Sequence, residues 1–195
     1  MSRIIEYIVK MLPFMLIALP VIVILRVVVF KAKKRTKLNL RHEIACVLFF
    51  MFMVGLSSQT FAPVFESGAD GTAALLRNNL VNANFIPFKV FADTYREVFV
   101  NGRVNYFIIN FLGNVIMFAP IGFFVPLLWD VRARNVILTG FLYSFAVEFS
   151  QLFIGRGTDV DDLWLNTLGT LLGFLIYKLL SKKIGAFMRK FRYGR

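Results

Sequence analysis

The chain has 195 residues, of which 58% are hydrophobic and 16% aromatic, and its mean hydropathy is +0.69. This composition is too apolar for an ordinary soluble domain, so the chain requires a non-aqueous solvent. The net charge of +12 is compatible with nucleic acid or anionic lipid as a partner. Because the charges occur in short runs beside long apolar segments, they favour lipid and argue against nucleic acid. The single cysteine, Cys46, excludes an internal disulfide and is expected to be buried.

Five segments are apolar enough to be membrane spans, since about 20 apolar residues in a helix cross the hydrocarbon layer. They cover residues 4–30, 44–65, 104–129, 136–154 and 163–180. No small-x-small cleavage site follows the first segment, so we expect it to be retained rather than removed as a signal peptide. The sequence therefore predicts an all-α integral membrane protein with about five transmembrane helices.

The basic residues determine the predicted orientation, because cytoplasmic loops are enriched in lysine and arginine. With five spans, the basic segments 31–41, 132–134 and 182–195 fall on one side. The N-terminus is then outside and the C-terminus inside, as in a multi-pass plasma-membrane protein. His42 lies in one of these basic loops, and we expect it to be solvated.

Three regions follow from this pattern. Residues 1–65 hold two N-terminal transmembrane helices with a basic cytoplasmic loop, and residues 66–180 hold an extracytoplasmic loop and three more spans. Residues 181–195 form a basic tail in which apolar residues recur at helical spacing, which is typical of a helix lying on the anionic inner leaflet. A solvated tail is the alternative.

One stretch of the long loop is apolar but too short to span. It begins at Asn84 and continues through Phe88 to Phe91. The pattern near 84–91 predicts an interfacial or re-entrant segment, with an aromatic loop at the membrane surface as the alternative.

Polar residues inside the last three spans are costly in a membrane and therefore informative. Asn110 and Asn114 share a helix face, where asparagine is typical of interhelical hydrogen bonds, and Pro120 predicts a kink or break. Glu148 lies about 9 Å from the outer end of its span, and a carboxylate at the bilayer centre costs roughly 2.5–3.5 kcal/mol. It therefore needs a partner, a raised pKa or water. Gln151 follows on the same face.

The turn before the last span carries Arg156, Asp159, Asp161 and Asp162. Glycines on either side of Arg156 allow a reversal toward Glu148, whose countercharge it would be. Helix capping alone also explains the aspartates.

Along the last span, Asp162, Asn166, Gly169 and Gly173 form one stripe, and the two glycines predict a helix-packing surface. We predict that the polar residues of these segments converge in one extracytoplasmic pocket, formed by Asn84, Asn110, Asn114, Glu148, Gln151, Arg156, Asp159, Asp162 and Asn166.

Three of these segments, in this order, resemble the VanZ-like family of bacterial membrane proteins, which is named for an accessory protein of teicoplanin (glycopeptide) resistance. The resemblance rests on the segments 84–88 and 110–122, and then on Glu148, Gln151, Phe153, Arg156, Asp159, Asp162, Asn166, Gly169 and Gly173. It covers about half of the chain and leaves the first two spans out. It implies a role in the cell envelope but assigns no active site.

Three functions remain open. The first is an envelope-associated binding or accessory protein, whose partners would be membrane lipids and an envelope lipid or lipoglycopeptide. The second is a membrane enzyme acting on a lipid-linked phosphate, and the third a proton-coupled lipid transporter or flippase. Asp-x-Asp-Asp matches no established metal-ligand spacing, and we predict no metal and no cofactor. The five spans show no evident internal repeat, which argues against the transporter.

Overall fold

The computed structural model describes residues 2–34, 37–66, 83–154 and 158–192, with the helix ends 2–8, 60–66 and 152–154 described by their backbone alone. The long helices are α1 (Ser2–Ala32), α2 (Leu40–Glu66), α6 (Gly113–Leu128), α7 (Ala133–Ile154) and α8 (Val160–Met188). The short elements are α4 (Lys89–Tyr95), α5 (Val104–Tyr106), the π-helices η1 (Arg96–Val100) and η2 (Phe107–Leu112), and the 3-10 helix η3 (Arg189–Phe191). The predicted all-helical class is confirmed.

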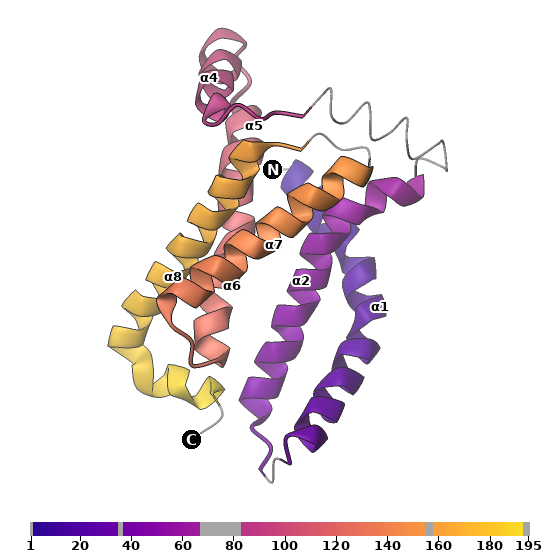
Figure 1. Cartoon of the computed structure of the whole chain (residues 1–195), viewed down its shortest axis with the longest axis vertical. Coiled ribbons are helices and arrows are strands. Elements are labelled where there is room, and N and C mark those ends of the chain that lie inside the picture. Colours follow the sequence, from indigo (N-terminus) through magenta and orange to yellow (C-terminus); the bar gives the residue numbers. More distant parts are fainter. Residues whose placement is uncertain (1, 35–36, 67–82, 155–157, 193–195) are drawn as a thin grey trace.

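Four helical stretches within the described ranges are long and apolar enough to cross a membrane: Val9–Ala32, Leu40–Gln59, Val104–Leu128 and Val160–Phe191. The chain is therefore a helical membrane protein. Helix α7 is not among the four over the residues whose side chains are described, which end at Gln151. The predicted count of about five spans stays a prediction, although α7 does return the chain toward the α4 end of the bundle (Figure 1).

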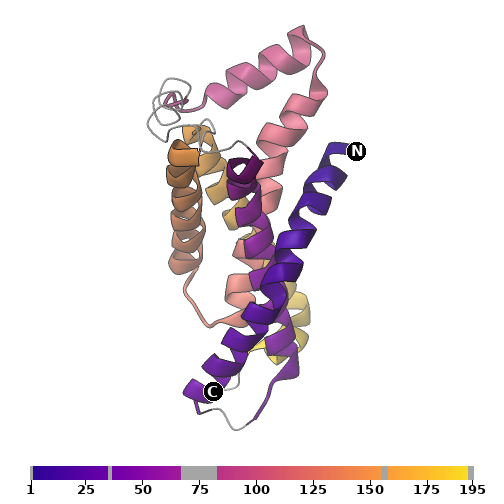
Figure 2. The ribbon, with the colours of Figure 1, turned by 90° about the vertical axis from the view of Figure 1, so that its right-hand side faces the viewer.

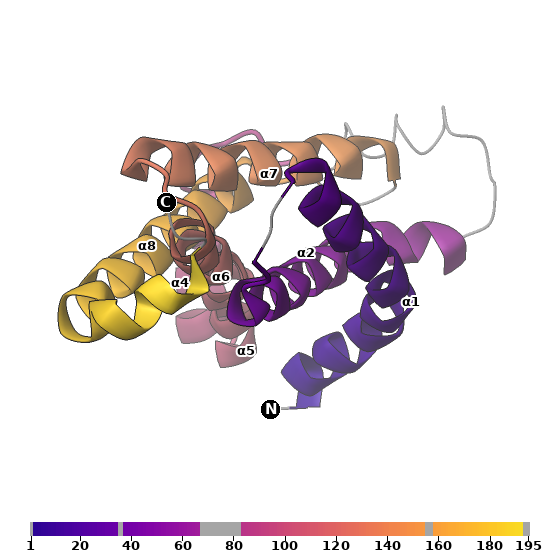
Figure 3. The same ribbon diagram turned by 90° about the horizontal axis from the view of Figure 1, so that it is seen from below.

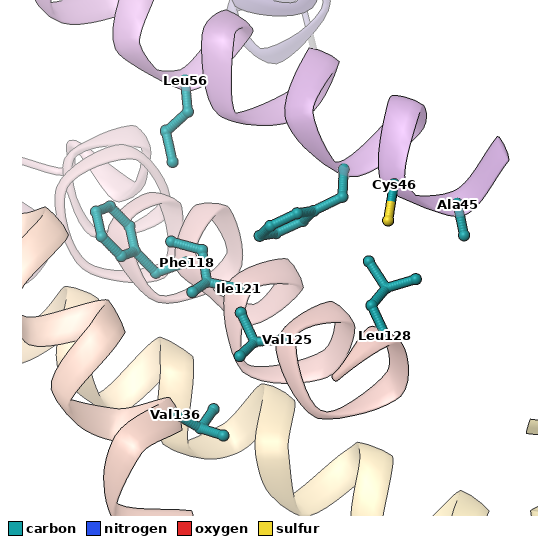
Figure 4. Packing of buried hydrophobic residues seen from close by; sticks show 9 residues of the cluster. Ala45, Cys46, Leu56, Phe118, Ile121, Val125, Leu128 and Val136 are labelled. Atoms are coloured by element: carbon teal, nitrogen blue, oxygen red, sulfur yellow. The ribbon is translucent and has the colours of Figure 1, made fainter. Parts of the chain in front are cut away.

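Helix α6 is the centre of the bundle, where it packs most extensively on α8 and also contacts α2 and α7. Seen along the bundle, α1 lies on the outside against α2, its principal contact (Figure 3). One apolar cluster fills the half of the bundle away from α4, where Phe118, Ile121, Val125 and Leu128 of α6 face Cys46 and Leu56 of α2 (Figure 4). Cys46 is fully buried, as predicted.

The basic segments after α1, after α6 and at the C-terminus gather at the same end of the bundle, and α4 lies at the other end (Figure 1). This arrangement is the one that the charge pattern requires. Which end faces the cytoplasm stays a prediction. Helix α6 continues through Pro120 without a break, and the irregular backbone lies earlier, in the π-helix η2.

The contact between α6 and α8 depends on glycines. A Cβ atom added at Gly169 would lie 2.2 Å from the carbonyl oxygen of Val115, and one added at Gly173 would lie 1.9 Å from that of Ala119. Gly122 of α6 likewise lies against the backbone of Thr170. The two backbones therefore touch, and even one methyl group would push them apart.

Replacing Gly173 by alanine should destabilise the protein by about 1–3 kcal/mol, because the new methyl group overlaps a backbone atom that has no room to move. Gly113→Ala is the matched control, since its Cβ would come no closer than 3.6 Å to the carbonyl oxygen of Ile108. Thermal unfolding in detergent measures both variants. Equal midpoints for the two would show that α6 and α8 separate at little cost.

The C-terminal tail differs at its end from the predicted surface helix. Met188 is buried, and Phe191 packs against the apolar cluster of α2 and α6. The amide of Asn39 donates to the carbonyl oxygens of Lys190 (3.0 Å) and Arg192 (2.8 Å). The tail thus folds back onto the bundle because its apolar residues find a protein surface there.

His42 is not solvated, and that prediction is wrong: its side chain is 2% exposed. Its Nδ1 atom lies 2.8 Å from the carbonyl oxygen of Phe191, so Nδ1 carries the proton that is donated. In the neutral ring, Nε2 then accepts from the Cys46 thiol at 3.3 Å. The sequence could not show this, because the partner lies 149 residues away.

Arg192 also holds the C-terminal tail against the bundle. Its guanidinium donates to the carbonyl oxygen of Pro126 (2.6 Å) and to the hydroxyl of Tyr177 (2.5 Å), and it lies 3.6 Å from the carboxylate of Asp130. Arg192→Ala should therefore release the tail and speed tryptic cleavage after Arg189 and Lys190. Lys183→Ala, at an exposed position, should leave the rate at these bonds unchanged. Equal cleavage rates in wild type and Arg192→Ala would contradict the contact.

Candidate functional site

The loop residue Asn84 is joined to the junction of α7 and α8 by an isolated parallel β-bridge with Asp159. The backbone N–H of Asn84 donates to the carbonyl oxygen of Thr158 (2.8 Å), and that of Val160 donates to the carbonyl oxygen of Asn84 (2.9 Å). The amide of Asn84 also donates to Oδ1 of Asp159 (2.7 Å). Two segments 75 residues apart in sequence therefore meet here.

Asp161 is the residue that fixes the start of α4, and its side chain is fully buried. Its Oδ1 accepts from the backbone N–H of Phe88 (2.5 Å) and from the indole N–H of Trp164 (2.8 Å). Its Oδ2 accepts from the backbone N–H of Val90 (2.7 Å). Three donors satisfy the charge that burial would otherwise make costly.

Sequence reasoning explained the aspartates by helix capping and did not include Asp161 in the pocket. Asp159 is indeed the cap, and its Oδ1 accepts from the backbone N–H of Asp161 (2.8 Å) at the start of α8. The only available signal was the run of three carboxylates before an apolar helix. That run does not reveal which of the three points inward.

Glu148 is buried at the same junction rather than facing lipid, with 6% of its surface exposed. Its Oε2 accepts from the backbone N–H of Asp159 (3.1 Å), and its carbonyl oxygen accepts from the hydroxyl of Thr158 (3.2 Å). The carboxylate therefore has a backbone donor supplied by the turn that follows α7. Arg156, the predicted countercharge, lies outside the described residues.

Two further predicted residues connect α8 with its neighbours. The amide of Asn114 on α6 donates to Oδ1 of Asp162 on α8. The amide of Asn166 donates to the hydroxyl of Ser144 on α7 (2.9 Å). Oδ1 of Asn166 is buried and has no hydrogen-bond partner among the described residues.

The remaining predicted residues within the described ranges are Asn110 and Gln151. Asn110 is exposed; its amide donates to the carbonyl oxygen of Tyr106 (3.1 Å), and its own carbonyl oxygen accepts from the amide of Asn114 (3.1 Å). Gln151 is half-buried near the end of α7. The structure thus connects Asn84, Glu148 and Asp159, and separately Asn114 and Asp162. A single pocket that includes all nine residues stays a prediction.

A groove lies at this end of the bundle, between η1 and the start of α5, and has a volume of about 850 Å³. Its lining residues are Glu97, Gly102, Arg103, Val104, Asn105, Tyr106, Ile109 and Asn110. The groove shares only Asn110 with the predicted pocket. Sequence reasoning missed it because η1 reverses into α5 through Gly102, whose φ of +67° no pattern had indicated.

One ion pair and one hydrogen bond fix one wall of the groove. The Arg103 guanidinium lies 3.2 Å from a carboxylate oxygen of Glu97, whose other oxygen accepts from the amide of Asn101 (3.0 Å). Arg103 is 72% exposed, so its remaining donors are available to a ligand. Among the residues that the structure describes, no three His, Cys, Asp or Glu side chains are grouped to hold a metal ion.

Together, the fold and these contacts define a polytopic helical membrane protein with a hydrogen-bonded polar network and a polar groove at one end. Residues 16–181 match the family model described as VanZ/LLP1, so the chain belongs to the VanZ/LLP1 family. The match includes α2 and half of α1, which the sequence resemblance had left out. No curated protein and no solved structure matches the chain.

Asp161→Asn should loosen the start of α4, because an amide nitrogen would replace one of the two oxygens that accept from Phe88, Val90 and Trp164. Leaving a buried donor unsatisfied costs about 1–3 kcal/mol. Hydrogen exchange of residues 86–92 should therefore be faster in this variant. The control is Asp93→Asn, whose ion pairs with Lys89 and Arg96 are near the surface. Unchanged exchange in Asp161→Asn would show that other contacts hold the segment.

Proposed function

We propose that this VanZ/LLP1-family protein is an accessory protein of the plasma membrane that binds an amphiphilic envelope component at its extracytoplasmic end. The ligand class is a lipid-bearing glycopeptide, of which teicoplanin is an example, or an envelope lipid with a comparable polar headgroup. The observation that carries the proposal is the groove between η1 and α5.

The groove suits an amphiphile because its lining combines polar and apolar side chains. Glu97 and Arg103 supply charge, and Asn105 adds an amide. Val104 and Ile109 are apolar and belong to a helical stretch that is long enough to cross the membrane. A polar headgroup could therefore bond to the loop side while its acyl chain remains in lipid.

The carboxylates of Asp161, Asp159 and Glu148, which we call the carboxylate network, favour a binding function over catalysis or proton transport. Asp161 accepts three hydrogen bonds, Asp159 caps α8, and Glu148 accepts from the backbone of the following turn. These groups stabilise the framework beside the groove. The proposed role of the network is thus to hold the groove in shape, with Asn84 connecting the loop to the helices.

The proposal includes the orientation derived from the basic loops, which places α4 and the groove outside. It also retains Arg156 as the countercharge of Glu148. Arg156→Ala would then leave the Glu148 carboxylate less well compensated, and Arg156→Lys would restore this only in part because lysine lacks the bidentate geometry.

Binding of fluorescent teicoplanin to the full chain in nanodiscs tests the function. We expect saturable binding that weakens about tenfold in Arg103→Ala, which corresponds to about 1.4 kcal/mol, the scale of one charge-assisted hydrogen bond. Arg96→Ala is the matched control, because Arg96 is similarly exposed and lies outside the groove lining.

Two further measurements distinguish a lipid-bearing glycopeptide from an envelope lipid as the ligand. Teicoplanin without its acyl chain should bind more weakly if the ligand is an amphiphile. An envelope lipid would be identified as the ligand by two results together. Extracted envelope lipids would displace teicoplanin, and a lipid would copurify with the wild type but not with Arg103→Ala. Absence of saturable binding by either class, or equal affinity of Arg103→Ala and wild type, would refute the proposal.

A further inference from the structure

An exposed aromatic row runs along the helix formed by α4 and η1. It consists of Phe88 (61% exposed), Phe91 (53%), Tyr95 (64%) and Phe99 (75%). Their spacing of three, four and four residues places them on one face. A soluble surface rarely exposes four large aromatic side chains in a continuous line.

The opposite face of this helix is charged. Asp93 pairs with Arg96 (2.9 Å) and lies 3.9 Å from Lys89, and Glu97 pairs with Arg103 (3.2 Å). The segment is therefore amphipathic, and its polar side carries two basic residues, Lys89 and Arg96, and two acidic ones, Asp93 and Glu97. This combination is typical of helices that lie in the plane of a membrane interface.

The helix also has the position that such a role requires. Figure 2 shows it running crosswise at one end of the bundle, beyond the start of the α5–α6 stretch, before the chain turns down into that stretch. Exposed Val104, Ile108 and Ile116 continue along α5, η2 and α6. The aromatic row is thus close to the surface that faces the lipid.

The backbone of Phe88 gives a second, independent argument. Its φ is +66°, a left-handed conformation that is unusual for a bulky residue and that glycine adopts freely. The hydrogen bonds from Phe88 and Val90 to Asp161 hold this conformation. Its ring nevertheless lies mostly exposed, in contact with Phe91 and Trp164 (ring centroids 6.4 and 5.5 Å apart). A strained backbone that keeps an aromatic ring exposed indicates that the ring contacts a partner other than this chain.

We propose that the α4–η1 helix is an interfacial anchor, whose aromatic row enters the boundary between headgroups and acyl chains of the leaflet at this end. The partner is the lipid surface itself. Aromatic rings favour that depth, and Lys89 can reach anionic headgroups from it. The proposal does not depend on the ligand of the groove, because the aromatic row and the groove are different surfaces.

Spin labelling of the full chain in vesicles of phosphatidylethanolamine and phosphatidylglycerol tests the anchor. Cys46→Ser removes the native thiol, and single cysteines are introduced as Phe99→Cys and, as the control on the charged side, Arg96→Cys. Both native side chains are exposed, so neither label should disturb packing. Equal gel-filtration profiles would verify the fold of both variants.

We expect the label at position 99 to collide more often with oxygen, which concentrates in lipid, than with a water-soluble nickel complex. The label at position 96 should show the reverse preference. Equal access of nickel to both labels would overturn the proposal, because the row would then lie in water. Shielding of the label at 99 from both reagents would also overturn it, since that result indicates a protein partner.

Discussion

The α4 end of this protein depends on how one buried carboxylate is satisfied. Asp161 lies at the start of α8 and accepts from two backbone N–H groups and one indole, all of which are within the fold. An unpaired carboxylate at this depth would be prohibitive, so the loop must approach α8 closely enough to supply those donors. The same contacts impose the left-handed backbone at Phe88, which sets the direction of α4 and η1. The groove and the aromatic row are consequences of that direction.

The helical class, the helix positions and the burial of Cys46 could be predicted, because hydropathy is a local property of the sequence. Gly169 and Gly173 could be placed on one stripe for the same reason, since helical periodicity is regular. Glu148 was identified by its cost in an apolar segment, and the structure buries it beside Asp159. These inferences needed only spacing and the physical chemistry of one helix at a time.

Other features could not be predicted because they arise from pairs distant in sequence. Nothing near Asp161 indicates that two of its donors, the backbone N–H groups of Phe88 and Val90, lie more than 70 residues earlier. The sequence around His42 predicts a solvated loop residue. In the structure the tail folds back and places the carbonyl oxygen of Phe191 beside the ring. The groove depends on the reversal at Gly102, and a single glycine in a long loop is too weak a signal to locate it.

Helix α1 is stabilised differently from the rest of the bundle. Little of its apolar length is buried against protein, and its main neighbour is α2, to which the ion pair between Arg26 and Glu43 (2.7 Å) also connects it. Its position in the membrane therefore depends on partition into lipid. Any sufficiently apolar sequence would partition equally well. In evolutionary terms, α1 can exchange most of its side chains among leucine, isoleucine and valine with little penalty, whereas α6 and α8 cannot. Sequence divergence within the family should accordingly accumulate at the amino-terminal helix faster than at the glycine contact.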